Sequence, residues 1–193
     1  MRTLLVAAAL AVCCLQAFAA ANPDCQVCVD FSGTASSWAD VQSRIDPELY
    51  DVVDAYLCIY GINEFVGICL AVGVSSEIQC AALGYTSLLP DSHVWGPWEE
   101  GTYLCSPVCL YDRFLYFARV SFVYLGGSGD IMILDHQEYP RWVLDCSSPA
   151  EVDYYCVWMH GGVGKPALEG DEDCYPVVPV EDASWGAVKS LYR

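Results

Sequence analysis

RFLYFARVSFVYLGGSGDIMILDHQEYPRWVLDC, which runs from Arg113 to Cys146, carries the clearest structural pattern in the chain. Between Tyr116 and Tyr124 every second residue is apolar or aromatic, whereas Arg119 lies between two of them. A period of two is typical of a strand with one buried face. We therefore predict a strand whose buried side begins at Tyr116.

Two further apolar runs follow this strand. The first is Ile131–Leu134, and three glycines before it supply the positive φ angles that a chain reversal needs: Gly126, Gly127 and Gly129. This spacing predicts a β-hairpin. The second run, Arg141–Cys146, also alternates, so we expect the three strands to share one apolar face that a second layer covers.

Strand patterns also dominate the rest of the chain. Only Tyr50–Gly61 is ambiguous: Asp46 and the proline after it are a helix-start signal, but β-branched and aromatic residues favour a strand. Ser32–Ser43 is predicted to be a loop and Gly161–Lys165 a turn. Further strands are predicted at residues 25–31, 65–74, 78–86, 102–110 and 152–160.

Short strands at this spacing, with turn residues between them, indicate an all-β fold. We predict an antiparallel β-sandwich of immunoglobulin-like or jelly-roll type, stabilised by disulfides and followed by a short C-terminal tail. A sandwich domain is expected at residues 20–175, because about 170 residues suffice for one core and hardly for two. Residues 176–193 are expected to form a linker and the tail.

The first 19 residues read as a signal peptide. Arg2 precedes an apolar run, Leu4–Leu15, and the small-residue site Ala17-Phe18-Ala19 follows. The rest of the chain is therefore expected to be exported, to the extracellular space or the periplasm.

Acidic residues far outnumber basic ones. The chain has 25 Asp and Glu against 8 Lys and Arg, for a net charge of −17. Such a surface repels phosphate backbones, so we expect no nucleic-acid partner. The longest apolar run after the signal, Phe65–Val74, is far shorter than the roughly twenty residues that span a bilayer, so no membrane span is expected.

Cysteines are numerous, and ten of them lie beyond the signal. An even number in an exported chain predicts up to five disulfides. Two local pairings, Cys105–Cys109 and Cys146–Cys156, would each close a short loop. For the closely spaced Cys25 and Cys28 a structural bridge is favoured over a redox role, because strand residues follow them. The ten are Cys25, Cys28, Cys58, Cys69, Cys80, Cys105, Cys109, Cys146, Cys156 and Cys174.

Several motifs resemble those of a family of secreted proteins from uncultured bacteria. They are YPRWVLDC from Tyr139, HGGVGK from His160, GDEDC from Gly170 and the ending VEDASWGAVKSLYR. The resemblance implies a protein exported to a bacterial cell envelope and carries no activity with it. The runs between Tyr50 and Thr86 also resemble the cohesin-like sandwiches of bacterial surfaces, which implies the same fold class.

The tail is the most distinctive segment. It is basic, whereas the rest of the chain is acidic, and a short helix there would place its apolar residues on one face. One interpretation is a helix docked on the sandwich. The other is a sorting or attachment signal read by a sorting machinery, carried by Trp185, Gly186, Lys189, Tyr192 and Arg193.

Aromatic residues suggest a binding surface. Trp95, Trp98 and Tyr103 are candidates for a platform that binds a protein or glycan ligand, because their rings combine apolar faces with polar edges. No specific catalytic constellation is evident, so we predict a non-catalytic, exported structural or binding module.

Two other kinds of site are weighed against this. Asp171, Glu172 and Asp173 offer oxygen ligands for a structural Ca²⁺, the only cofactor considered, although acidic clusters are usually just solvated. The alternative function is a secreted hydrolase that uses carboxylate and imidazole groups near Asp135, His136 and Glu138; a polar strand end explains these residues equally well.

Overall fold

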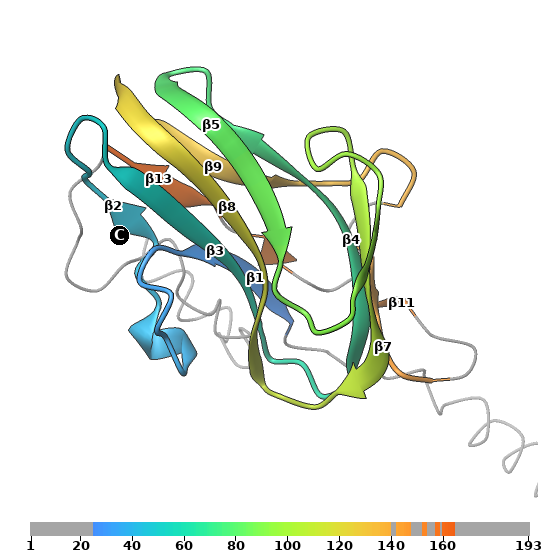
Figure 1. Cartoon of the computed structure of the whole chain (residues 1–193). Coiled ribbons are helices and arrows are strands. Elements are labelled where there is room, and N and C mark those ends of the chain that lie inside the picture. Colours follow the sequence, from blue (N-terminus) through green and yellow to red (C-terminus); the bar gives the residue numbers. More distant parts are fainter. Residues whose placement is uncertain (1–24, 140–141, 148–151, 154–156, 159, 165–193) are drawn as a thin grey trace, which may run out of the picture.

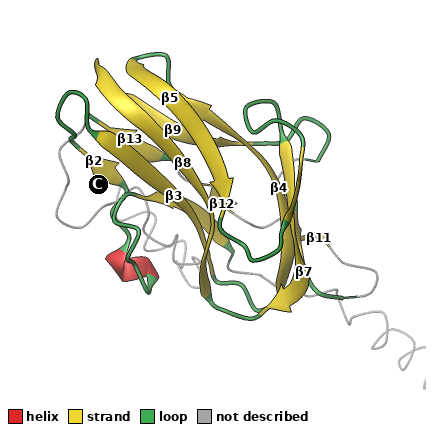
Figure 2. Cartoon of the chain, viewed as in Figure 1, coloured by secondary structure: helices red, strands yellow, loops and turns green. Residues whose placement is uncertain are grey.

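The computed structural model describes residues 25–139, 142–147, 152–153, 157–158 and 160–164. In this part the chain forms two β-sheets that pack face to face, so the predicted all-β sandwich is confirmed. Figure 1 shows β3, β8 and β5 side by side in one layer. Within the described residues the only helical element is one 3-10 turn, Trp38–Asp40 (Figure 2).

The first sheet has the strand order β12-β1-β3-β8-β5, and the second β11-β10-β4-β9-β13-β2, with β7 beside β4 and β6 beside β7. Pairing is antiparallel except between β1 and β12 and between β13 and β2. The strands are β1 Gln26–Asp30, β2 Arg44–Ile45, β3 Val52–Tyr60, β4 Phe65–Val74, β5 Ile78–Ser87, β6 His93–Trp95, β7 Thr102–Leu110, β8 Phe114–Gly127, β9 Gly129–Leu134, β10 Val143–Leu144, β11 Val152–Asp153, β12 Val157–Trp158 and β13 Gly161–Val163.

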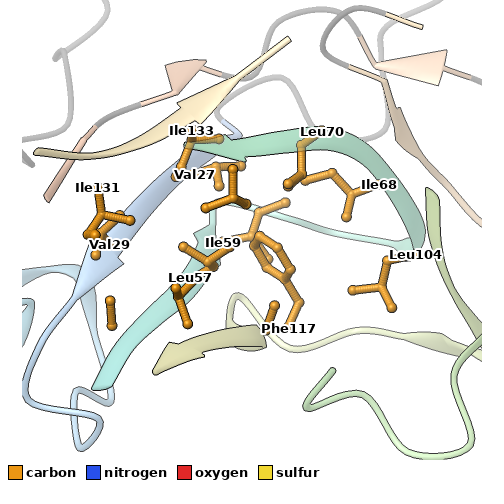
Figure 3. Close-up of a cluster of buried hydrophobic side chains, with 14 of the residues drawn as sticks. Val27, Val29, Leu57, Ile59, Ile68, Leu70, Leu104, Phe117, Ile131 and Ile133 are labelled. Atoms are coloured by element: carbon orange, nitrogen blue, oxygen red, sulfur yellow. The ribbon is translucent and has the colours of Figure 1, made fainter. Parts of the chain in front are cut away.

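Apolar residues from both sheets fill the space between them. Val27 and Leu57 from the first sheet and Ile68 and Ile131 from the second are fully buried (Figure 3). In each of these strands the residue two positions further on, such as Val29 or Ile59, is buried as well. This is the period of two expected for strands with one buried face. The ambiguous segment Tyr50–Gly61 contains β3, so the strand interpretation is confirmed and the helix is not formed.

The predicted hairpin between β8 and β9 is wrong. β8 pairs with β3 and β5, whereas β9 pairs with β4 and β13, so the turn carries the chain from one sheet to the other. Gly126 and Gly127 have positive φ angles, of 123° and 88°, but Gly129 does not. Alternation along a strand reports which face is buried and not which strand lies beside it. The expected sheet of three neighbouring strands therefore does not form.

The prediction that Tyr116 faces the core is also wrong, because β8 contains a bulge. Leu57 lies opposite Ala118 and Cys58 lies opposite Tyr116, so Phe117 is an extra residue in β8. A bulge of one residue reverses the facing of every position on one side of it. Phe117 and Ala118 are therefore both buried in the core, and Tyr116 points to the outer face.

Gly161–Val163, predicted to be a turn, is the buried strand β13. It lies between β9 and β2 in the second sheet. A Cβ built on Gly161 would lie 2.6 Å from Val29 in the opposite sheet, so glycine is needed here for close packing rather than for a turn. β6, His93–Trp95, is a further strand in a segment where no strand was predicted.

The cysteine pairing differs from both local predictions. Cys109 is bonded to Cys146, with 5.7 Å between their Cα atoms. The predicted Cys105–Cys109 and Cys146–Cys156 bridges are therefore wrong, because Cys109 and Cys146 are bonded to each other and Cys105 carries a free thiol. Cys25 and Cys28 each take part in a disulfide. Among the described cysteines, four carry free thiols: Cys58, Cys69, Cys80 and Cys105. Cys156 and Cys174 lie outside the described residues.

Candidate ligand-binding surface

β4 supplies the floor of the candidate site. Phe65 is in the core, and a register shift follows it. Beyond the shift the even-numbered residues, such as Ile68 and Leu70, are buried in the core, so the odd-numbered residues point to the outer face of the second sheet. Those residues are small: Gly67, Cys69 and Ala71. Cys69 is nevertheless fully buried, because larger side chains from the neighbouring strands cover it.

Strand pairing arranges aromatic residues in a row across this floor. Trp95 of β6 lies opposite Tyr103 of β7, which lies opposite Cys69 of β4. On the other side of β4, the Cys69 N–H donates a hydrogen bond of 2.8 Å to the carbonyl of Trp142, just before β10. Residues opposite one another in paired strands project to the same side of a sheet. Trp95, Tyr103 and Trp142 therefore share the outer face.

Further rings extend the row at both ends. The ring centroids of Trp95 and Tyr103 are 5.6 Å apart, and His93 stacks on Trp95 at 5.4 Å. At the other end Tyr139 lies 4.4 Å from Trp142, and the His136 ring lies 5.3 Å from Tyr139. We call this set the aromatic face; it consists of His93, Trp95, Tyr103, His136, Tyr139 and Trp142.

Two rings of the aromatic face are well exposed. Trp95 is 55% exposed and Tyr139 38% exposed. Burial raises the pKa of Tyr103, and a hydrogen bond to Cys105 raises it further, so the phenol stays protonated. Burial also raises the pKa of the Cys69 thiol to about 12, so no thiolate nucleophile forms beneath the rings near neutral pH.

His136 organises the loop that brings Tyr139 to the face. A Cβ built on Gly101 would lie 2.6 Å from the His136 ring, so the missing side chain lets the ring rest on β7. His136 Nδ1 accepts hydrogen bonds from the backbone N–H groups of Glu138, at 3.1 Å, and Tyr139, at 3.3 Å. In a catalytic triad this nitrogen is the one that a carboxylate orients. Here it holds a turn, and the hydrolase alternative stays a prediction.

Trp98 does not belong to the aromatic face. It stacks on Tyr85 of β5, with 5.6 Å between the centroids and 7° between the planes, and packs against the core. Its carbonyl accepts a hydrogen bond of 2.8 Å from the Val72 N–H. Of the three candidate residues, the structure brings Trp95 and Tyr103 together and places Trp98 between the sheets.

Sequence reasoning missed His93, Tyr139 and Trp142 as parts of this surface. His93 lies in a strand that the sequence does not predict, and Tyr139 and Trp142 reach the row only through the pairing of β10 with β4. One local signal was available: small residues at every second position of β4 leave space that side chains of neighbouring strands fill.

Other predicted sites are not part of this description. Asp171, Glu172 and Asp173, and the tail residues Trp185, Gly186, Lys189, Tyr192 and Arg193, lie outside the described residues. Within the described ranges no group of three or more His, Cys, Asp or Glu side chains is arranged to hold a metal ion. The same part of the chain has no helix of the length and apolarity that crossing a membrane requires.

Comparisons with known proteins give similarity at the level of structure alone. No protein-family model and no curated protein sequence matches the chain. The solution structure of CaCohA2 from Clostridium acetobutylicum is similar, with a TM-score of 0.48 and 13% identity over 78% of this chain and 94% of that chain. The crystal structure of CaCohA2 in complex with CaDoc0917 has a TM-score of 0.47 and 13% identity, over 72% of this chain and 97% of that chain.

A third similar structure is the seventh ScaB type I cohesin from Pseudobacteroides cellulosolvens, with a TM-score of 0.43 and 8% identity over 77% of this chain and 96% of that chain. The solved structures that this chain resembles thus include cohesins, as the sequence resemblance implied. The resemblance to secreted proteins that share the tail has no counterpart among these comparisons.

Proposed function

We propose that the chain is a non-catalytic binding module, exported to a bacterial surface or the surrounding space, whose aromatic face takes a protein ligand. The observation that supports this proposal is the row of rings on the outer side of the second sheet. Trp95 and Tyr139 are exposed near its two ends, and strand pairing fixes the positions of Trp95 and Tyr103.

Physical chemistry favours binding at such a row. Trp and Tyr are enriched among the residues that contribute most to binding energy, because each buries a large area at a small cost in side-chain entropy. Residues held on paired strands lose little further freedom when a ligand arrives. A set of rings on one outer face, with Trp95 and Tyr139 exposed, is thus a surface on which ligand burial gives a net gain.

The inclination of the rings favours a protein over a glycan. The planes of Trp95 and Tyr103 differ by 43°, and those of Tyr139 and Trp142 by 45°. A flat polysaccharide chain stacks best on coplanar rings, whereas protein side chains fit an uneven surface. Glycan binding is therefore the competing outcome of the test.

The test uses the full chain and a random peptide library. Trp95→Ala should weaken the binding of the selected peptides about tenfold or more, as expected for an aromatic residue that contributes much of the binding energy. Tyr111→Ala is the matched control, because Tyr111 is 67% exposed and lies outside the aromatic face. Equal affinity for wild type and Trp95→Ala would contradict the proposal. If the protein instead binds cellulose, xylan or chitin and this binding depends on Trp95, the aromatic face is a binding surface but its ligand is a glycan.

Export and attachment form the second part of the proposal. The signal-like start and the cysteine content support export, and the basic tail supports a sorting role. Deletion of residues 184–193 should move the protein from the cell surface to the medium or the periplasm without unfolding it. An unchanged distribution among the three fractions would remove the sorting role.

The calcium site at Asp171, Glu172 and Asp173 stays a proposal that calcium titration of the same protein can test.

A further inference from the structure

A second surface has no role in the proposed function. It lies where β3 begins and β8 ends. Four large apolar residues are exposed there, and we call them the apolar tip: Leu49, Tyr50, Val52 and Leu125, which are 60%, 75%, 72% and 36% exposed. Val52 lies opposite Val123 in the sheet. A Cβ built on Gly126 would lie 3.6 Å from Leu49 Cδ2, so the loop before β3 rests on the end of β8.

The backbone holds this tip in an unfavourable conformation. Tyr50 has a φ of 75°, a region that costs a residue with a side chain about 1 kcal/mol or more. Two hydrogen bonds fix the backbone here: Tyr50 N–H donates to the Tyr124 carbonyl at 2.7 Å, and Tyr124 N–H donates to the Asp51 carbonyl at 2.9 Å. The fold therefore presents the Tyr50 ring outward at a cost in free energy.

The described chain ends beside this tip. A Cβ built on Gly164, its last residue, would lie 2.4 Å from the Gly127 carbonyl oxygen and 3.1 Å from the Tyr124 hydroxyl. Tyr124 is the residue whose backbone holds Tyr50. Gly164 thus lies at the end of β8 that carries the apolar tip.

The composition of the final segment complements the tip. Residues 183–193, ASWGAVKSLYR, contain two basic residues and no acidic one, and four of them are large and apolar: Trp185, Val188, Leu191 and Tyr192. The loop that carries the tip, residues 46–51, contains three exposed acidic residues and no basic one. An apolar patch with an acidic border fits an apolar segment with basic residues.

We propose that residues 183–193 dock on the apolar tip of their own chain. Residues 165–182 separate Gly164 from this segment, and a flexible linker of that length has a typical span of about 25 Å. Such a linker gives an effective concentration in the millimolar range, so even weak docking is populated. Docking competes with any factor that reads the tail.

The experiment is trypsin cleavage of the full-length chain after Lys189, followed by mass spectrometry. The test variant is Tyr50→Gly/Val52→Thr, in which glycine suits the positive φ and threonine keeps the β-branched shape of Val52. Cleavage should be about 5–10 times faster than in wild type, because proteolysis follows the population of the open form. The control is Tyr111→Ser, which removes an equally exposed ring elsewhere and should leave the rate unchanged.

A second variant, Asp46→Asn/Glu48→Gln, removes charge without changing the apolar tip. It should speed cleavage by a smaller factor, and added salt should act in the same direction in wild type. Equal cleavage rates in wild type and both variants would overturn the proposal. Protection that grows with protein concentration would also overturn it, because the tail would then dock on a second copy.

Discussion

Phe117→Ala is expected to destabilise the protein by about 3–5 kcal/mol, the usual cost of removing a buried phenylalanine side chain. Phe117 is fully buried between the sheets, where it packs in the same cluster as Leu57 and Ile59. In a domain of this size the loss corresponds to roughly 6–20 °C in melting temperature. Thermal unfolding followed by circular dichroism measures it.

The same variant distinguishes the bulged strand from a regular one. If β8 alternated without interruption from Tyr116, Phe117 would point outward with Arg119, and its truncation would cost little. Leu125→Ala is the matched control, because Leu125 is on the same strand and 36% exposed; its effect should stay within about 0.5 kcal/mol. Similar melting temperatures for Phe117→Ala and Leu125→Ala would contradict the bulge.

Asp30→Asn is the second substitution with a large expected effect, because Asp30 is a fully buried carboxylate that gathers five donors. Oδ1 accepts from the N–H groups of Ser32, at 3.1 Å, and Gln42, at 2.8 Å. Oδ2 accepts from the Ser32 hydroxyl, at 2.8 Å, the Gly33 N–H, at 2.9 Å, and the Tyr116 hydroxyl, at 2.5 Å. These bonds hold residues 32–42 against the outer face of β1 and β3.

An asparagine at this position replaces one acceptor oxygen with an amide NH₂ group, so at least two donors lose their partner. We expect a loss of about 2–4 kcal/mol, since each buried donor left without a partner costs about 1–3 kcal/mol. Tyr116→Phe removes a single donor and should cost less. Asp40→Asn is the control in the same loop, because Asp40 is exposed and bonded only to Ser36 and Ser37.

Chemical denaturation with urea separates these cases. The predicted order of midpoints is wild type and Asp40→Asn highest, Tyr116→Phe lower and Asp30→Asn lowest. A urea midpoint for Asp30→Asn at or above that of Tyr116→Phe would show that the Asp30 carboxylate does not hold residues 32–42 in place.

Fold class was predictable from the sequence because burial in strands leaves a period of two. β4, β5 and β7 begin and end within a residue or so of their predicted bounds, and β3 was recovered from its β-branched content. Partner strands were not predictable, since alternation in β8 and β9 is the same whether the two form a hairpin or lie in different sheets. The bulge at Phe117 was hidden for a related reason: one extra residue changes facing without changing composition.

The candidate site was predictable only in part. Trp95 and Tyr103 stand out because both are aromatic and near turn residues, but so does Trp98, which the structure places against Tyr85. Trp142 joins the row through a backbone bond to Cys69, a contact 73 positions away in the chain that no local pattern reports. Gly161 was predicted to lie in a turn but lies in strand β13. In a sequence, a glycine needed for close packing cannot be told from a glycine needed for a turn.

The central claim is that β7 and β10 flank β4 and so bring the two ends of the aromatic face onto one sheet. Peptide mapping of the non-reduced protein, with free thiols alkylated before digestion, tests this most directly. The account predicts a peptide containing Cys109 linked to one containing Cys146, with Cys69 and Cys105 alkylated. A Cys105–Cys109 or Cys146–Cys156 link would contradict it.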